Sequence, residues 1–456
     1  MIKKLLANVG DYKKASLLTP VYVAGEVALD VIMPLIMAMM IDQGIEKGHA
    51  GVILRYGGLL FLCSLLALML GTLGGRTAAI ASAGFARNLR HNLFSKIQDF
   101  SFSNIDRFSS SSLITRMTTD VTNVQNAYQM IIRILVRSPL ILVFSLIMVS
   151  TISPELMLVY LVVLPILAIG LALVIRFAHP LFLKVFRIYD RLNNVVQENL
   201  QGIRVVKSYV REEQQEELFD EVSNDVYRNF TLAQRIVSFN MPLMQFSIYS
   251  CMLLLSWFGA QLIVEHSSLT TGELVSMFNY TMQILMSLMM MSMAFVQILI
   301  ARTSAQRVVE VLDEESDLKN PASPLTEVKD GSIVFENACF SYANDQTRLA
   351  LENVNLRIES GEVIGIIGGT GSAKSTLVQL IPRLYDVIDG RVLVGGQDVR
   401  AYDLAALRDQ VSMVLQNNVL FSGTISENLR WGNAEATDEE IQRGAKIAPA
   451  DPFIQE

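Results

Sequence analysis

A glycine-rich segment between a short apolar run and a helix-like run has the residue types best suited to chemistry. Its residues are Gly368, Gly369, Thr370, Gly371, Ser372, Ala373, Lys374, Ser375 and Thr376. Glycines let successive backbone N–H groups turn inward to form an anion-binding nest, and the N-terminus of the following helix adds partial positive charge. In such a P-loop the lysine reaches the β- and γ-phosphates, and the next hydroxyl binds Mg²⁺. The segment therefore predicts a nucleoside triphosphate site in which Lys374 and Ser375 have these two roles.

One position departs from the usual pattern, which has glycine immediately before the lysine. Ala373 keeps the N–H donor but adds a methyl group where the backbone packs closely against phosphate. If this position needs a positive φ, alanine costs on the order of 1–2 kcal/mol there. We therefore predict weakened nucleotide binding. The alternative is a tolerated change or an error in the sequence.

The elements that must position this loop form a region of α/β character at 332–456. Strand-like runs occur at 332–336, 354–358, 363–367 and 411–415, and 374–384 is predicted to be the helix after the loop. A polar, acidic linker at 313–331 contains Pro321 and Pro324 and precedes this region.

Residues 1–312 are far more apolar and are predicted to be a membrane domain. Six stretches approach or exceed the roughly 20 residues that span a bilayer as a helix. They lie near 16–43, 57–80, 130–151, 155–177, 241–265 and 273–300. With 51% hydrophobic and 18% charged residues, the chain is neither disordered nor wholly soluble. A net charge of −7 argues against a nucleic-acid partner, and the scattered cysteines and histidines favour neither disulfides nor a metal centre.

Lysine and arginine residues predict the orientation of these spans. They are frequent between spans 2 and 3 and between spans 4 and 5. They are absent between spans 3 and 4 and between spans 5 and 6. The positive-inside rule then places the long connections, both termini and the α/β region in the cytoplasm. Each long connection is predicted to be helical, with a softer point at Ser109–Ser112 or Gln201-Gly202 that permits a short transverse helix. The first 15 residues are predicted to form an interfacial helix.

Charged residues inside predicted spans are costly and usually face protein or water. Glu26 and Asp30 in span 1, and Arg133 and Arg137 in span 3, each have i, i+4 spacing and lie at similar depths. We predict that these pairs meet, with separate neutralisation or a wet cavity as the alternative. Span 6 is rich in methionine, which suits a surface that accepts varied apolar shapes, although ordinary packing is the alternative. These methionines are Met277, Met282, Met286, Met289, Met290, Met291 and Met293.

Several segments resemble ABC transporters of the exporter type. Tyr342, in FSYAND (340–345), has the position of the aromatic residue that stacks on adenine in this family. Gln416, in VLQNNVLFSGTISENLRWGN (414–433), resembles the Q-loop glutamine, which contacts Mg²⁺ and the transmembrane half. RFSSSSLITRMTTDV (107–121) and ENLQGIRVVKSYVREE (198–213) resemble the two coupling segments. The resemblance implies coupling roles for Arg107, Phe108, Ser109, Ser110, Ser111, Gly202, Ile203 and Arg204.

The resemblance also implies four motifs that this family carries further downstream: the signature motif, the Walker B aspartate, the catalytic carboxylate and the switch histidine. None precedes Glu456, so we interpret the sequence as C-terminally truncated, with a naturally short variant as the alternative. An incomplete parallel sheet would leave apolar edges unpaired. On this interpretation, the chain alone does not hydrolyse ATP.

The expected fold is a multidomain membrane protein. An all-α six-helix transmembrane domain with long cytoplasmic helical extensions precedes an incomplete α/β P-loop NTPase domain. The resemblance implies half of an ATP-driven exporter, with a heterodimeric or homodimeric partner half, in contact with membrane lipids. It is nearest to half-transporters of heterodimeric bacterial multidrug exporters, which implies a hydrophobic or amphipathic, multidrug or lipid-like substrate. The alternatives are an ATP-gated channel or regulatory half, and a P-loop ATPase on an unrelated anchor, which the long cytoplasmic helices disfavour.

Overall fold

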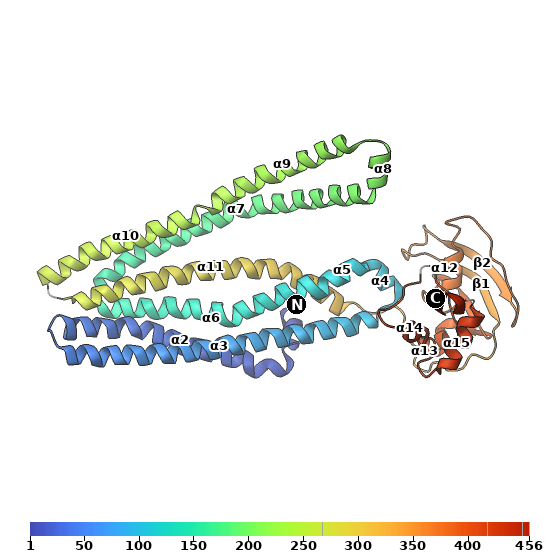
Figure 1. Ribbon diagram of the computed structural model, residues 1–456, viewed down its shortest axis with the longest axis horizontal. Helices are drawn as coiled ribbons and strands as arrows, with labels where there is room; N and C mark the ends of the chain where they lie inside the picture. Colours follow the sequence, from blue (N-terminus) through green and yellow to red (C-terminus); the bar gives the residue numbers. More distant parts are fainter. Residues whose placement is uncertain (267, 417, 449, 456) are drawn as a thin grey trace. The chain divides into compact units, whose positions relative to one another are not determined.

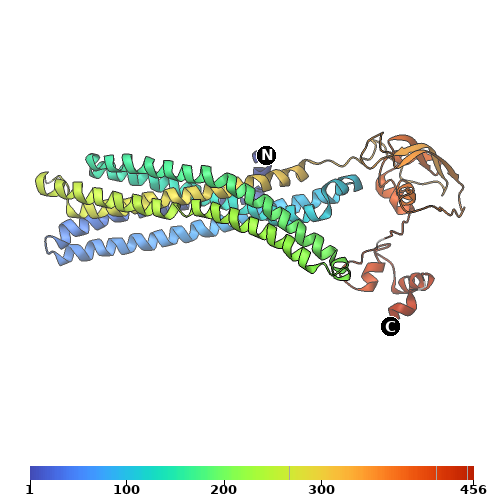
Figure 2. The ribbon, with the colours of Figure 1, turned by 90° about the horizontal axis from the view of Figure 1, so that it is seen from above.

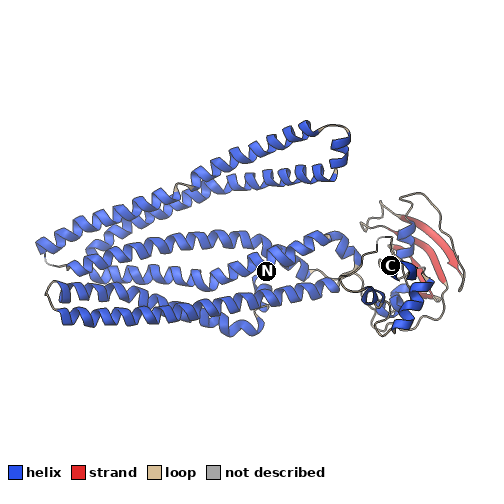
Figure 3. Cartoon of the chain, viewed as in Figure 1, coloured by secondary structure: helices blue, strands red, loops and turns tan. Residues whose placement is uncertain are grey.

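A computed structural model describes residues 1–266, 268–416, 418–448 and 450–455. The chain divides into two compact units. Unit 1 comprises Met1–Asp99 and Phe108–Glu315, and unit 2 comprises Phe100–Arg107 and Ser316–Glu456. Unit 1 is helical, and the strands lie in unit 2 (Figure 3). A piece of the first long connection, Phe100–Arg107, therefore belongs to the same unit as the P-loop segment.

The long helices of unit 1 account for the predicted spans. Six of the described helical stretches are long and apolar enough to cross a membrane, and each contains one predicted span. The helices of this unit are α1 (Ile2–Ala7), α2 (Lys13–Met40), α3 (Ala50–Gln98), α5 (Ser110–Thr115), α6 (Val121–Ile152), α7 (Pro154–Gln201), α8 (Ile203–Ser208), α9 (Glu212–Val237), α10 (Asn240–Gln261) and α11 (Thr271–Asp313). The chain is therefore a multi-pass membrane protein.

Apolar stripes hold the long helices together. Helix α2 runs along α3, α6 runs along α11, and α7 runs along α9 and α10 (Figures 1 and 2). The main core cluster combines Val23, Val27 and Val31 of α2, spaced one turn apart, with residues of α6, α7, α10 and α11. Buried hydroxyl groups find partners within this core: Tyr160 Oη lies 2.7 Å from Thr281 Oγ1, and Tyr280 Oη donates to the Val31 carbonyl at 2.8 Å.

Both predicted soft points are confirmed as helix breaks. Helix α7 ends at Gln201, and the short helix α8 separates it from α9 (Figure 1). In the first connection, α3 ends at Gln98, and α4 (Phe102–Phe108) and α5 follow. Ser109 lies between α4 and α5 with φ +55°, and its hydroxyl accepts a hydrogen bond from Ser112 N at 3.4 Å. The single interfacial helix expected over the first 15 residues is wrong, because α1 ends at Ala7 and Gly10 has φ +50°.

Unit 2 contains an antiparallel sheet in the order β2-β1-β3-β4. Its strands are β1 (Ile333–Phe340), β2 (Leu351–Ile358), β3 (Asp389–Val394) and β4 (Gln397–Asp398). The runs predicted at 332–336 and 354–358 fall almost wholly in β1 and β2. The helices of this unit are α4, α12 (Lys374–Gln379), α13 (Leu404–Gln410), α14 (Ile425–Leu429), α15 (Asp438–Ile447) and α16 (Asp451–Gln455). The core joins Phe335 and Phe340 of the sheet to Leu380, Tyr402 and Leu407.

Two of the predicted strands are wrong. Residues 363–367 and 411–415 have no strand structure, because no described segment supplies the hydrogen-bond partners that a strand requires. The apolar side chains of the first run are correspondingly exposed, at 96% for Val363 and 98% for Ile367, whereas Val411 and Met413 of the second run are half-buried against the core. The helix predicted over 374–384 is also shorter, since Pro382 lacks an N–H group and disfavours helical geometry at the preceding residue.

Candidate functional site

The predicted P-loop forms a turn that folds around its own lysine. Lys374 Nζ donates hydrogen bonds to the carbonyl oxygens of Gly368 and Gly369, at 2.8 and 2.7 Å. Ser372 Oγ also donates to the Gly369 carbonyl at 2.9 Å. Within the described part of the chain, the N–H groups of Gly371 and Ala373 make no hydrogen bond. The turn therefore combines a cationic side chain with available N–H donors, which is the donor set that a phosphate needs.

Ala373 has the left-handed conformation on which its predicted cost depends. Its φ and ψ are +59° and +24°, and it caps the N-terminus of α12. Side chains with a Cβ are strained in this region. Gly371, two residues earlier, has φ +83° at no such cost. The sequence places alanine at the position of the loop where glycine would relieve strain.

Ser375 and Thr376 differ in their surroundings. Ser375 is exposed, and its hydroxyl makes no hydrogen bond in the described residues, so it is available to a metal ion. Thr376 is buried, and its Oγ1 lies 2.9 Å from Tyr342 Oη. Tyr342 is the predicted adenine-stacking residue and is 53% exposed, with its ring beside α12. The fold thus brings Tyr342 to the helix that follows the loop.

Gln416 is not brought to the loop by any hydrogen bond of the described residues. It is exposed, and the residue after it, Asn417, lies outside the described chain. Its predicted contact with Mg²⁺ therefore stays a prediction.

Tyr385, which the sequence analysis did not identify, joins the first coupling segment to the region beside the loop. Its hydroxyl donates to Asp106 Oδ2 of α4 at 2.7 Å, and its ring centroid lies 6.0 Å from that of Phe102. On the other side its ring meets Tyr342 edge-on, with centroids 5.3 Å apart. Burial raises the pKa of Tyr385 above its usual value, and the hydrogen bond to Asp106 raises it further. The hydroxyl therefore stays protonated and donates. Since Tyr342 contacts Thr376, a short chain of contacts runs from α4 to α12.

The remaining predicted coupling residues lie at the helix breaks. Phe108 is buried with the Arg116 guanidinium 4.8 Å above its ring, and Ser109 Oγ lies 3.3 Å from Ser111 Oγ. Arg107 lies in the last turn of α4 and Ser110 at the start of α5. At the other connection, Gly202 precedes α8, and Ile203 and Arg204 lie in α8. Ile203, Val205 and Tyr209 expose apolar surface at this second tip.

The predicted ion pairs within the spans are confirmed for one arginine. Arg137 Nη1 lies 2.5 Å from Glu26 Oε1, and Arg137 Nη2 lies 2.9 Å from Asp30 Oδ2. Asp30 is held further by Gln283, whose Nε2 donates to the Asp30 carbonyl at 3.0 Å. Arg133, one turn away on α6, makes no ion pair within the described residues.

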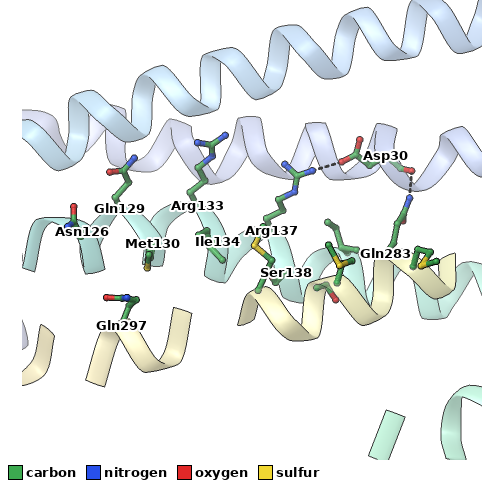
Figure 4. A pocket seen from close by; sticks show the side chains of 15 residues that line it. Asp30, Asn126, Gln129, Met130, Arg133, Ile134, Arg137, Ser138, Gln283 and Gln297 are labelled. Carbon is green, nitrogen blue, oxygen red and sulfur yellow. Dashed lines mark hydrogen bonds and ion pairs between the residues drawn. The ribbon is translucent and has the colours of Figure 1, made fainter. Parts of the chain in front are cut away.

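Beside these charges is a cavity of about 900 Å³ between α6 and α11 (Figure 4). Met282, Met286 and Met290 of α11 line it at one-turn spacing, which supports part of the methionine prediction. Met277 is instead buried in the core. The sequence analysis missed the polar lining of Asn126, Gln129 and Gln297, although Asn126, Gln129, Arg133 and Arg137 already share one helical face by their spacing.

Comparison with known proteins assigns both parts of the chain to protein families. Residues 18–289 match the family described as "ABC transporter transmembrane region", and residues 351–453 match the family "ABC transporter". The uncharacterized ABC transporter ATP-binding protein YfiB of Bacillus subtilis is 34% identical over 98% of this chain and 78% of its own length. Rv1273c of Mycobacterium tuberculosis, another uncharacterized ABC transporter ATP-binding protein, is 33% identical over 93% of this chain and 73% of its own.

A third relative carries a substrate in its name. The fatty acid ABC transporter ATP-binding/permease protein of Mycobacterium bovis is 31% identical over 80% of this chain and 57% of its own length. In all three, the similarity extends over most of this chain. Six of the described helices are long and apolar enough to cross a membrane, and the two matching regions are joined in one polypeptide. The chain therefore belongs to the ABC transporter family and is a half-transporter of the exporter type.

Proposed function

We propose that this protein is one half of an ATP-driven exporter that moves hydrophobic or amphipathic molecules across the cytoplasmic membrane. The observation that carries the proposal is the combination of two features in one chain. The long helices enclose a cavity lined by polar and apolar side chains, and a loop offers the hydrogen-bond donors that a phosphate needs. The half-transporter architecture implies dimerisation with a second half. We infer a heterodimer, with the α/β region and both termini in the cytoplasm.

Within the loop, Lys374 and the N–H groups of 368–376 would hold the phosphates of ATP, and Ser375 with Gln416 would hold Mg²⁺. The exposed hydroxyl of Ser375 and the available N–H donors fit these groups. Tyr342 would stack on adenine with its exposed face. Bound Mg²⁺ neutralises phosphate charge, while this chain's own residues bind and orient the nucleotide.

Coupling between nucleotide and membrane would pass through the two transverse tips. The contacts of Asp106 and Phe102 with Tyr385 support this role for the first tip, because they attach α4 to the nucleotide-binding unit. The exposed apolar side chains of α8 support docking of the second tip on a nucleotide-binding region. ATP must bind the conformations of the transporter with different affinity to drive such a change.

The test is uptake of a fluorescent amphiphile into inverted membrane vesicles that contain the assembled transporter. The proposal expects accumulation above the external concentration that requires ATP and is lost in Lys374→Ala. Equilibration without accumulation, dependent on ATP, would instead identify a gated channel and refute the pump. A Lys329→Ala variant changes a lysine outside the loop and serves as the matched control.

A further inference from the structure

We propose that the cavity between α6 and α11 binds an amphiphile with an anionic head group, and that Arg133 pairs with that head group. The inference rests on the proposed export function and names the substrate class for the same cavity. It depends on the distribution of charge, the position of Arg133 and the mixture of amide and apolar side chains in the lining.

The distribution of charge leaves one arginine available. Arg137 is bound by both Glu26 and Asp30, so its charge is already compensated. Arg133 lines the cavity, and in the described chain it has neither an ion-pair partner nor a hydrogen-bond acceptor. An arginine without an ion-pair partner in a membrane span is costly. A ligand anion would supply the partner that the Arg133 guanidinium lacks.

The position of Arg133 keeps its guanidinium accessible. It lies against α3 at Gly75, where an added Cβ would be 3.7 Å from Nη1. Arg133 is half-buried and lines the cavity, so part of its side chain stays open to a ligand. Figure 4 shows Arg133 between Gln129 and Arg137 on the same face of α6.

The lining offers both kinds of surface that an amphiphile requires. Asn126, Gln129 and Gln297 gather at the end beside Arg133 (Figure 4), and Met282, Met286 and Met290 of α11 add apolar surface to the same lining. Amides donate hydrogen bonds to a carboxylate or phosphate, and flexible thioethers adapt to an alkyl chain. The volume of about 900 Å³ is within the range of small-molecule sites.

A cationic head group fits the same place poorly. The cavity's acidic side chain, Asp30, already shares Arg137 with Glu26. A cation beside the amide end would face Arg133 with no carboxylate at that end to offset the repulsion. A neutral head group would leave Arg133 without an ion-pair partner.

The experiment measures binding of four ligands with the same alkyl chain to the assembled transporter in detergent. They are dodecanoate, dodecyl phosphate, dodecanol and dodecyltrimethylammonium, and comparison between variants cancels their partitioning into micelles. The wild-type protein should bind one or both anions most tightly, and the two anions distinguish a carboxylate from a phosphate substrate. Arg133→Gln should weaken anion binding on the order of tenfold and leave dodecanol binding unchanged.

Two variants make the result specific. Arg133→Lys keeps the charge and should retain most of the anion preference. Arg76→Gln removes an exposed arginine of α3 that does not line the cavity, and should change nothing. Equal binding of all four ligands to the wild-type protein, or equal losses for dodecanoate and dodecanol in Arg133→Gln, would overturn the inference.

Vesicle uptake separates this inference from the proposed function. ATP-driven accumulation of dodecanol-like neutral probes without any anion preference would refute the role of Arg133 and leave the exporter intact. Anion binding that depends on Arg133, without ATP-driven accumulation of any probe, would refute export and support the binding site.

Discussion

Replacing Ala373 by glycine tests whether the departure from the usual loop pattern has a physical cost. The residue holds φ +59°, and the left-handed conformation costs a residue with a Cβ roughly 1–2 kcal/mol. Glycine removes that cost but loses part of the gain, about 0.4–1 kcal/mol, through the greater freedom of the unfolded chain. The expected net gain in free energy is therefore about 1 kcal/mol.

The gain appears in the free energy of unfolding or in ATP affinity, depending on whether the loop has this conformation before ATP binds. If the loop holds it with and without nucleotide, Ala373→Gly raises the free energy of unfolding by about 1 kcal/mol and leaves ATP affinity unchanged. If ATP imposes it, the affinity for ATP rises by roughly fivefold, or up to about 30-fold if the full strain is relieved. Thermal unfolding and equilibrium ATP binding, measured on the same preparations, determine both contributions.

A matched control comes from the exposed Ala405 of α13. Ala405→Gly places glycine at a helical position and should lower the free energy of unfolding by about 1 kcal/mol. This effect is opposite in sign to the one expected for Ala373→Gly. If Ala373→Gly changes neither stability nor affinity, or if it behaves like Ala405→Gly, the strain argument is wrong.

Three further substitutions, two of them with a comparison variant, test the contacts on which the proposed coupling and the paired charges depend. Tyr385→Phe removes the hydroxyl that Asp106 accepts from but keeps the ring, so ATP-driven transport should fall several-fold while ATP affinity is unchanged; a parallel loss of ATP affinity would show that Tyr385 acts on the site itself. Arg137→Gln leaves Glu26 and Asp30 uncompensated and should destabilise the protein by about 3 kcal/mol in thermal unfolding, whereas Arg137→Lys should cost less, and equal effects would contradict the paired geometry. Asp120 is fully buried and accepts from Arg307 Nε at 2.8 Å, but Arg307 is half-exposed and regains water, so Asp120→Ala should cost about 1.5–3 kcal/mol, while the half-exposed Glu310, which binds Arg116, should tolerate Glu310→Ala within about 1 kcal/mol.

Patterns within one element were sufficient to predict much of the molecule. The six spans follow from apolar length, and the break at Gln201-Gly202 follows from local composition. The pairing of Arg137 with Glu26 and Asp30 could be predicted because a buried charge needs a partner and the two helices offered one at the same depth. The left-handed geometry of Ala373 could be predicted because glycine is usual there for a steric reason.

Features that depend on distant segments could not be predicted in the same way. The apolar runs at 363–367 and 411–415 have strand composition, but a strand exists only where another segment supplies hydrogen bonds. Tyr385 carries no local signal for its contact with Asp106, which is 279 residues away in the sequence. The cavity itself could not be predicted from the sequence, because its two walls come from α6 and α11 and meet only after folding.

The central claim is that binding of ATP to the loop at 368–376 changes the conformation of the membrane helices. The most direct measurement uses a variant without Cys63, Cys251 and Cys339 that carries one new cysteine at Gln297, on the polar lining of the cavity. Its rate of labelling by a water-soluble maleimide is measured with and without ATP and Mg²⁺ in the assembled transporter. We predict that nucleotide changes this rate several-fold and that Lys374→Ala abolishes the change. A labelling rate that is the same with and without nucleotide, while ATP is shown to bind, would contradict the claim.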